Sequence, residues 1–161
     1  MRQVDYLTPI GRLVITGDGD AVHSVLFEEG DALEFPMTDE LPEELKKAYE
    51  EIDAYFKGTG KDFTFCIAPQ VGTPFQREVW ESLRTIPYGE TGSYLQIATT
   101  VNRPKAVRAV GGANGKNPFT VVLPCHRIIG ASGKMVGYAG GLWRKEWLLA
   151  HEQKHKTTLS D

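Results

Sequence analysis

The 161-residue chain has no long hydrophobic run and only two cysteines. No segment approaches the ~20 consecutive apolar residues of a membrane-spanning helix, and the N-terminus lacks the apolar core of ~7–15 residues found in signal peptides. Cys66 and Cys125 are too few for a disulfide framework, which excludes the small disulfide-stabilised class. These absences predict a soluble, intracellular protein that has no membrane partner and keeps both thiols reduced.

Acidic residues are missing from a long window near the C-terminus. Residues 91–145 carry eight Lys and Arg and no Asp or Glu, whereas residues 1–90 have a balance of −10 and the whole chain a net charge of −3. Such a window is expected of a surface that faces a polyanion such as DNA. The alternative is a solvated face of biased composition.

The composition, 41% hydrophobic and 24% charged, suits one domain or two small ones. Short β-favouring runs separated by turn residues predict an antiparallel meander of Val4–Leu7, Arg12–Thr16 and Val22–Phe27, followed by a loop over 28–42. The spacing of apolar residues after Pro42 predicts a helix that ends at Gly58 and covers one face of this sheet.

A further strand is expected at Phe63–Ile67, with Cys66 as a buried strand residue. The Pro- and Gly-containing stretch that follows predicts a domain boundary near residue 70, which gives domains of residues 1–70 and 71–161. The fold class expected is α+β, a small sheet-plus-helix domain followed by a mainly helical one.

The second domain opens with a helix start signal, Thr73 as N-cap and Pro74 in the first turn. Helices are then expected from Ser93 to Val101 and from Pro104 onward, joined by the short turn Asn102-Arg103. Two helices with so short a connection predict a helix-turn-helix, whose second helix would carry Lys105 and Arg108.

A β-like run, Phe119–Leu123, leads into Pro124-Cys125-His126-Arg127. A neighbouring base or positive field makes a thiol nucleophilic by raising its thiolate fraction. Neighbouring strand residues point to opposite faces, so Cys125 and His126 can cooperate only if the chain turns there. On local chemistry alone, a buried structural thiol and a satisfied histidine remain open alternatives.

Four strings carry a resemblance to a known family: RAVGGANGKNP from Arg108, PCHR from Pro124, GYAGGL from Gly137 and KEWLLAHE from Lys145. Over residues 73–152 the chain closely resembles the O6-alkylguanine-DNA alkyltransferases, also called methylated-DNA-protein-cysteine methyltransferases. The resemblance implies repair of double-stranded DNA by irreversible transfer of an alkyl group to the protein, once per molecule, with no cofactor and no metal. It also implies a ribonuclease H-like arrangement for residues 1–70.

The family's catalytic residues match positions of this sequence. Cys125 matches the acceptor thiol, His126 the base that activates it through a bridging water, and Glu152 the carboxylate that orients the imidazole. Asn117 matches a residue whose amide holds the turns around the site together, and Tyr94 one that helps to extrude the target nucleotide.

The resemblance also assigns DNA contacts and a base pocket. Arg108 matches the arginine that fills the space left by the extruded base, in the minor groove, where small residues permit close approach. The expected DNA-binding residues are Tyr94, Arg103, Lys105, Arg108, Ala109 and Gly112, and the expected pocket residues are Ile128, Tyr138, Ala139, Gly140 and Lys145. Thr120 and Ala139 stand where some relatives carry proline and serine, which suggests room for alkyl groups larger than methyl.

Some relatives hold zinc in the N-terminal domain, but Cys66 and His23 are the only cysteine and histidine there, so no such site is expected. The chain is expected to act as a monomer and, if its source is a prokaryote, to lie in the cytoplasm in association with the nucleoid. Two functions other than alkyl transfer are compatible with a DNA-binding chain or with a reactive cysteine. A non-catalytic lesion-recognition protein is disfavoured because such relatives carry tryptophan in place of Cys125. A cysteine hydrolase is disfavoured because it would give the basic window of residues 91–145 no function.

Overall fold

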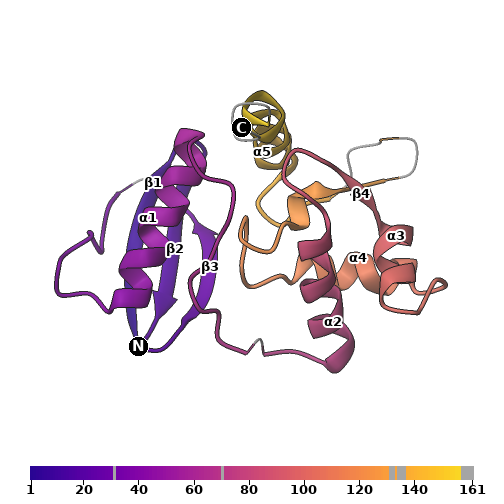
Figure 1. Cartoon of the computed structure of the whole chain (residues 1–161), viewed down its shortest axis with the longest axis horizontal. Coiled ribbons are helices and arrows are strands. Elements are labelled where there is room, and N and C mark those ends of the chain that lie inside the picture. The colour runs from indigo at the N-terminus through magenta and orange to yellow at the C-terminus, as the bar shows by residue number, and fades with distance from the viewer. Residues whose placement is uncertain (31, 70, 131–132, 134–136, 157–161) are drawn as a thin grey trace. The chain divides into compact units, whose positions relative to one another are not determined.

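A computed structural model describes residues 1–30, 32–69, 71–130, 133 and 137–156. The described chain forms two compact units that divide at residue 70, and each is taken by itself below (Figure 1). Among the described helices, none is both long and apolar enough to cross a membrane. An α+β fold is confirmed.

The first unit is a three-stranded antiparallel sheet with one helix. The strands β1 (Arg2–Thr8), β2 (Gly11–Gly17) and β3 (Val22–Glu28) pair in the order β1-β2-β3, which confirms the predicted meander. Helix α1 (Glu43–Lys57) lies along this sheet (Figure 1), and it buries Leu45, Ala48, Ile52, Tyr55 and Phe56. Gly58 ends the helix with φ 81°, a left-handed conformation that glycine adopts without strain.

The expected strand at Phe63–Ile67 is not formed, and Cys66 is exposed rather than buried. A single parallel bridge joins Ile67 to Val22, so no ladder develops. Carboxylates of α1 accept hydrogen bonds from the backbone N–H groups of this segment instead. Glu51 accepts from Thr64 N–H at 2.7 Å, and Glu44 accepts from Cys66 N–H at 2.8 Å. The prediction failed because side chains of the helix satisfy this segment, a long-range effect that local β propensity does not contain.

The second unit is mainly helical. Its elements are α2 (Pro74–Ser82), the 3₁₀ helix η1 (Leu83–Thr85), β4 (Gly92–Ser93), α3 (Tyr94–Thr100), α4 (Val107–Gly115), the 3₁₀ helix η2 (Cys125–Arg127), β5 (Ile128–Ile129) and α5 (Leu142–His155). Thr73 caps α2 as predicted, in a reciprocal capping box with Gln76. Trp80 of α2 is buried and donates its indole N–H to the Ala113 carbonyl of α4 at 2.7 Å, which ties these two helices together.

The corner between α3 and α4 is longer than predicted. Helix α4 begins at Val107 rather than Pro104, so Lys105 lies in the connection and not on the second helix. Asn102 adopts φ 61°, and Arg103 N–H returns to the Ala98 carbonyl at 2.8 Å. These bonds end α3 and redirect the chain before Pro104, whose ring lacks the N–H that would have continued the turn.

Candidate active site

The chain reaches Cys125 through a series of tight turns. The strand expected at Phe119–Leu123 is absent: Leu123 N–H bonds to the Phe119 carbonyl at 2.9 Å, and Val121 holds φ 74°. Pro124, with φ −79° and ψ 64°, forms an inverse γ-turn in which Cys125 N–H bonds to the Leu123 carbonyl at 2.7 Å. The 3₁₀ helix η2 follows at once, so Cys125 and His126 lie on a helical turn as their cooperation requires.

Asn117 holds these turns in place. Its amide donates to the Leu123 carbonyl at 2.7 Å and to the Phe119 carbonyl at 3.3 Å, and its Oδ1 accepts from Phe119 N–H at 2.9 Å. A positive φ is strained for a β-branched residue such as Val121, and such strain persists only where surrounding bonds over-determine the backbone. Asn117 supplies those bonds.

His126 and Glu152 form a buried pair, with Nε2 2.6 Å from Oε2 and both side chains almost fully excluded from solvent. Arg127 binds the same carboxylate through Nε at 2.8 Å and Nη2 at 3.1 Å, and Gly89 N–H adds a bond of 3.3 Å. Arg127 also donates to the Ile86 carbonyl at 2.7 Å. The carboxylate therefore joins α5, η2 and the segment after η1 in one network.

The charges in this network determine which of Glu152 and His126 carries a proton. Although burial opposes ionisation of Glu152, its partners His126 and Arg127 hold its pKa far below the usual range. Burial lowers the pKa of His126; the Glu152 carboxylate acts in the opposite direction, and the nearby Arg127 charge adds to the lowering. An ionised carboxylate can only accept, so His126 Nε2 carries the proton, and Nδ1 is the basic nitrogen. Nδ1 is buried and has no hydrogen-bond partner among the described residues.

Cys125 is 5% exposed, and burial raises the pKa of its thiol. Asn117, Lys145 and Tyr138 act in the opposite direction, with the Lys145 ammonium buried against the Ile128 carbonyl. A thiol with a raised pKa needs a base to become a nucleophile, and a neutral imidazole next to it in sequence suits that task.

A cavity of about 220 Å³ adjoins Cys125 through Asn114, although Cys125 itself is not among its lining residues. Asn114, one of its lining residues, donates to the Cys125 carbonyl at 3.3 Å. Burial raises the pKa values of Tyr94 and Tyr138, and the negative charge of an ionised Cys125 would raise both further. The cavity is lined by Tyr94, Gly111, Asn114, Gly115, Gly137, Tyr138 and Ala139.

Of the residues expected in the pocket, Tyr138 and Ala139 line this cavity. Ile128 and Lys145 are fully buried and do not line it, and Gly140 accepts a hydrogen bond from Arg144 at 2.9 Å instead. Thr120 is buried in the turns between Phe119 and Leu123 and does not line the cavity either. The room for a larger alkyl group therefore depends on Ala139.

The expected DNA-binding residues lie on the surface of the second unit. Arg103, Lys105, Arg108, Ala109 and Gly112 are all exposed, whereas Val110, Ala113 and Asn114 on the inner face of α4 are buried. A Cβ added at Gly112 would meet no atom within 4 Å, so the fold itself does not require glycine there. Tyr94, at the start of α3, is partly buried and lies at the cavity.

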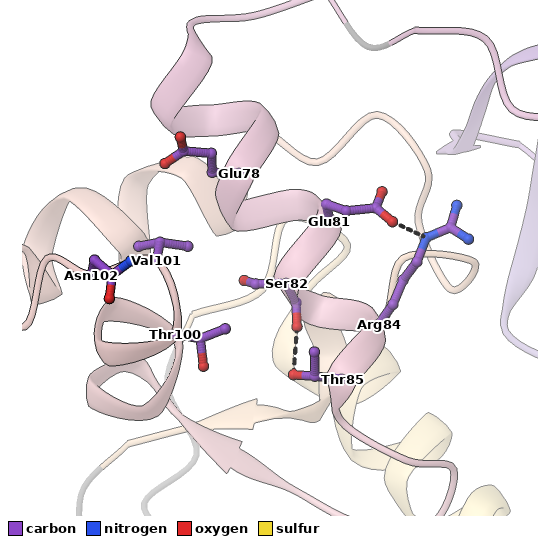
Figure 2. Close-up of a pocket in the computed structure, with 8 residues that line it drawn as sticks. All are labelled: Glu78, Glu81, Ser82, Arg84, Thr85, Thr100, Val101 and Asn102. Atoms are coloured by element: carbon purple, nitrogen blue, oxygen red, sulfur yellow. Dashed lines mark hydrogen bonds and ion pairs between the residues drawn. The ribbon is translucent and has the colours of Figure 1, made fainter.

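A second hollow, of about 580 Å³, lies between α2 and the end of α3. Figure 2 shows its polar lining, in which Glu81 pairs with Arg84 and the Ser82 carbonyl accepts from Thr85. It contains neither a nucleophilic thiol nor a histidine. Among the described residues, no group of three or more His, Cys, Asp and Glu side chains could hold a metal ion.

Sequence reasoning did not assign roles to Arg127, Asn114 or the Gly89 N–H. Arg127 was visible only as a basic neighbour of the thiol, although its position beside His126 in PCHR could have suggested a partner for Glu152. Asn114 lies in a string rich in small residues, and nothing local indicates that its amide faces Cys125.

Comparisons with known proteins agree on one family. The model of the 6-O-methylguanine DNA methyltransferase DNA binding domain matches residues 74–154, and that of the ribonuclease-like domain of the same proteins matches residues 2–69. The methylated-DNA–protein-cysteine methyltransferases of Methanosarcina acetivorans and Mycolicibacterium paratuberculosis are 46% and 47% identical. The matches cover 90% and 96% of this chain and 94% and 92% of the relatives.

Solved structures that resemble this chain belong to the same family. The crystal structure of Mycobacterium tuberculosis OGT in complex with DNA is 39% identical, with a TM-score of 0.85 over 96% of this chain and 94% of that one. The O6-methylguanine methyltransferase of the same organism gives 40% identity and a TM-score of 0.83 over 96% and 93%. Both domains and nearly the whole length are matched, so the chain belongs to the 6-O-methylguanine DNA methyltransferase family.

Proposed function

We propose that this protein repairs DNA by transferring the alkyl group of O6-alkylguanine to its own Cys125, once per molecule and without a cofactor. The observation that carries the proposal is the buried pair of His126 and Glu152, adjoining Cys125 in a unit that matches the family's DNA binding domain. The named relatives are methyltransferases that act on methylated DNA and a protein cysteine, which supports the same chemistry here.

Alkyl transfer begins with removal of the proton from the Cys125 thiol. His126 Nδ1 accepts the proton of the Cys125 thiol, directly or through one water, and Glu152 stabilises the imidazolium that forms. The thiolate attacks the alkyl carbon, a carbon–sulfur bond forms, and the carbon–O6 bond breaks with its electron pair on the guanine. A thioether does not hydrolyse under cellular conditions, so the acceptor is not regenerated.

The lesion must leave the base stack before the sulfur can reach it, which costs a few kcal/mol. In the proposal, α4 enters the minor groove, Arg108 fills the space left by the base, and Arg103 and Lys105 bind the phosphates. Tyr94 pushes the nucleotide out. Burial raises the pKa of Tyr94, so its hydroxyl stays protonated and donates to the guanine as negative charge develops.

The ranges of the two family matches support domains of residues 1–70 and 71–161. The acceptor thiol, its base and the helix-turn-helix all lie in the second unit, so one chain suffices and a monomer is the proposed active form. A DNA substrate would place the protein at the nucleoid, in the cytoplasm of a prokaryote.

The experiment is to incubate stoichiometric protein with duplex DNA that contains O6-methylguanine and to weigh the intact protein. We expect one added methylene mass that saturates at one per chain and is absent from Cys125→Ser. Cys66→Ser is the matched control, since it removes the exposed thiol and leaves the transfer intact. Repeated turnover, or a label on Cys66, would reject the proposal.

A further inference from the structure

The side chain of Arg103 lies over the ring of a residue from another helix. Its guanidinium carbon is 5.8 Å from the centroid of the Phe75 ring, a distance at which the face of an aromatic ring attracts a cation. Arg103 follows α3 in the corner that leads to α4, whereas Phe75 is the second residue of α2. The contact therefore holds an exposed cationic side chain of the corner against the start of α2.

The backbone is fixed at both ends of this contact. Phe75 lies inside the capping box that Thr73 and Gln76 form at the start of α2. Arg103 N–H bonds to the Ala98 carbonyl at 2.8 Å, which fixes the corner. The direction of the guanidinium then depends on the side-chain torsions of Arg103. An exposed arginine would keep most of its rotamer freedom, and the Phe75 ring restricts it.

The corner that carries Arg103 is hollow and cationic. A hollow of about 540 Å³ is lined there by Arg103, Pro104, Lys105 and Ala106. The corner belongs to residues 91–145, which contain no Asp or Glu. Ala106 is also the N-cap of α4, the helix that the proposed function places in the minor groove. Charge complementarity and continuity with α4 therefore favour a phosphate of the duplex backbone as the occupant of this hollow.

We propose that Phe75 is a positioning residue for DNA binding, which orients the Arg103 guanidinium toward a backbone phosphate before the duplex binds. An arginine that is ordered in advance loses less conformational entropy when it contacts the phosphate, so the complex is tighter. Orientation matters because a guanidinium binds two phosphate oxygens through parallel N–H groups. The inference rests on the proposed function and adds how the protein prepares one of its phosphate contacts.

The test is a double-mutant cycle of Phe75→Leu and Arg103→Ala on duplex DNA that contains O6-methylguanine. Every protein also carries Cys125→Ser, so that no transfer occurs while dissociation constants are measured, and thermal unfolding verifies that each variant is folded. Phe75→Leu should weaken binding about threefold or more when Arg103 is present, within the range set by ordering one long side chain. In the Arg103→Ala background its effect should stay below about 1.5-fold, because coupled residues are not additive.

Two further measurements separate orientation from charge and from folding. Phe75→Tyr keeps the aromatic face and should bind DNA as the wild type does. Each phosphate contact contributes about −0.9 to the slope of log K against log salt concentration, so Arg103→Ala should reduce the magnitude of the slope by about 0.9. Phe75→Leu retains the cation and should lower the affinity with the slope of the wild type. With Cys125 restored, its rate of methyl transfer at saturating DNA should be unchanged.

The outcomes separate this inference from the proposed function. Binding that is unchanged by Phe75→Leu, or weakened equally with and without Arg103, would overturn the inference, since the ring would then have no role or act through the fold of α2. A slope unchanged by Arg103→Ala would also overturn it, because Arg103 would contact no phosphate. In these cases methyl transfer by the wild type still supports the proposed function. A wild type that binds as the cycle predicts and accepts no methyl group would reject alkyl transfer and leave the role of Phe75 in DNA binding supported.

Discussion

Glu152 Oε2 lies 2.6 Å from His126 Nε2, and the same carboxylate holds the Arg127 guanidinium at 2.8 and 3.1 Å. The arginine balances the buried negative charge, so the histidine can stay neutral and keep its other nitrogen free to accept a proton. This arrangement sets the tautomer of His126 and the loss of stability that follows when Glu152 is replaced or protonated.

The first prediction concerns that tautomer. Glu152→Gln keeps the shape of the side chain but can present an N–H to His126 Nε2, which would move the imidazole proton to Nδ1 and remove the base. We expect methyl transfer to slow by up to roughly 10⁴-fold, the loss seen when a base-orienting carboxylate becomes an amide. Single-turnover rates measure this, with the exposed Glu146→Gln on the same helix as control. A Glu152→Gln rate close to the wild type would contradict the assigned tautomer.

The second prediction concerns acid stability. The pKa of Glu152 is far below its ordinary value in the folded protein, so its contribution to stability is present above about pH 4.3 and lost as the pH falls toward the folded value. The lowered pKa of His126 acts in the same direction below about pH 6.5, since the unfolded chain then binds the extra proton. The free energy of unfolding in urea should fall by on the order of 2 kcal/mol between pH 5 and pH 2, the window in which the unfolded chain protonates Glu152.

The matched comparison for this acid effect is again Glu152→Gln against Glu146→Gln. The buried substitution should destabilise the protein by about 3 kcal/mol or more at pH 7, because Arg127 is left as an uncompensated buried charge. Its stability should then change less between pH 5 and pH 2, whereas Glu146→Gln should follow the wild type. Equal pH profiles for all three proteins would show that the buried network does not govern acid stability.

The third prediction concerns Gly112. Alanine is favoured over glycine in a helix interior by about 1 kcal/mol, and a methyl group there meets no protein atom within 4 Å. Gly112→Ala should therefore raise the melting temperature and yet weaken binding to duplex DNA, because the groove needs the space. Thr100→Ala, at the hollow of Figure 2, is the control that improves helix propensity on another surface and leaves binding unchanged. Tighter DNA binding by Gly112→Ala would exclude α4 from the groove.

The fourth prediction concerns Arg108. If its side chain replaces the extruded base, Arg108→Ala should slow methyl transfer from duplex DNA by about 10-fold or more, which corresponds to part of the few kcal/mol that extrusion costs. A single-stranded oligonucleotide with the same lesion has no base pair to open and should react with the variant nearly as fast as with the wild type. Equal losses on both substrates would indicate simple phosphate binding.

The fifth prediction concerns the alkyl group. Ala139 lines the cavity beside Cys125, and its small side chain leaves space there. We expect the wild type to accept benzyl as well as methyl from O6-alkylguanine, and Ala139→Leu to slow benzyl transfer by about 10-fold while methyl transfer changes little. Rates on the two duplexes decide this, and a wild type that refuses benzyl removes the hypothesis.

Local patterns accounted for much of the fold and for the residues that match the family. Short β-favouring runs and turn residues predicted β1 to β3, and capping signals predicted the start of α2 and the end of α1. The resemblance supplied Cys125, His126 and Glu152, and the structure brings the last two together across 26 positions. Such patterns succeed because propensity and capping depend on neighbours in the chain.

The two wrong strand predictions share a cause. The segments at Phe63–Ile67 and Phe119–Leu123 read as strands, but Glu51 and Asn117 bind their backbone groups and hold them in other conformations. The sequence by itself determined most of the helices and strands and which chemical groups are available. Only the tertiary structure decided that Arg127 neutralises Glu152 and that Asn114 faces both Cys125 and the cavity, because those contacts depend on how distant segments pack.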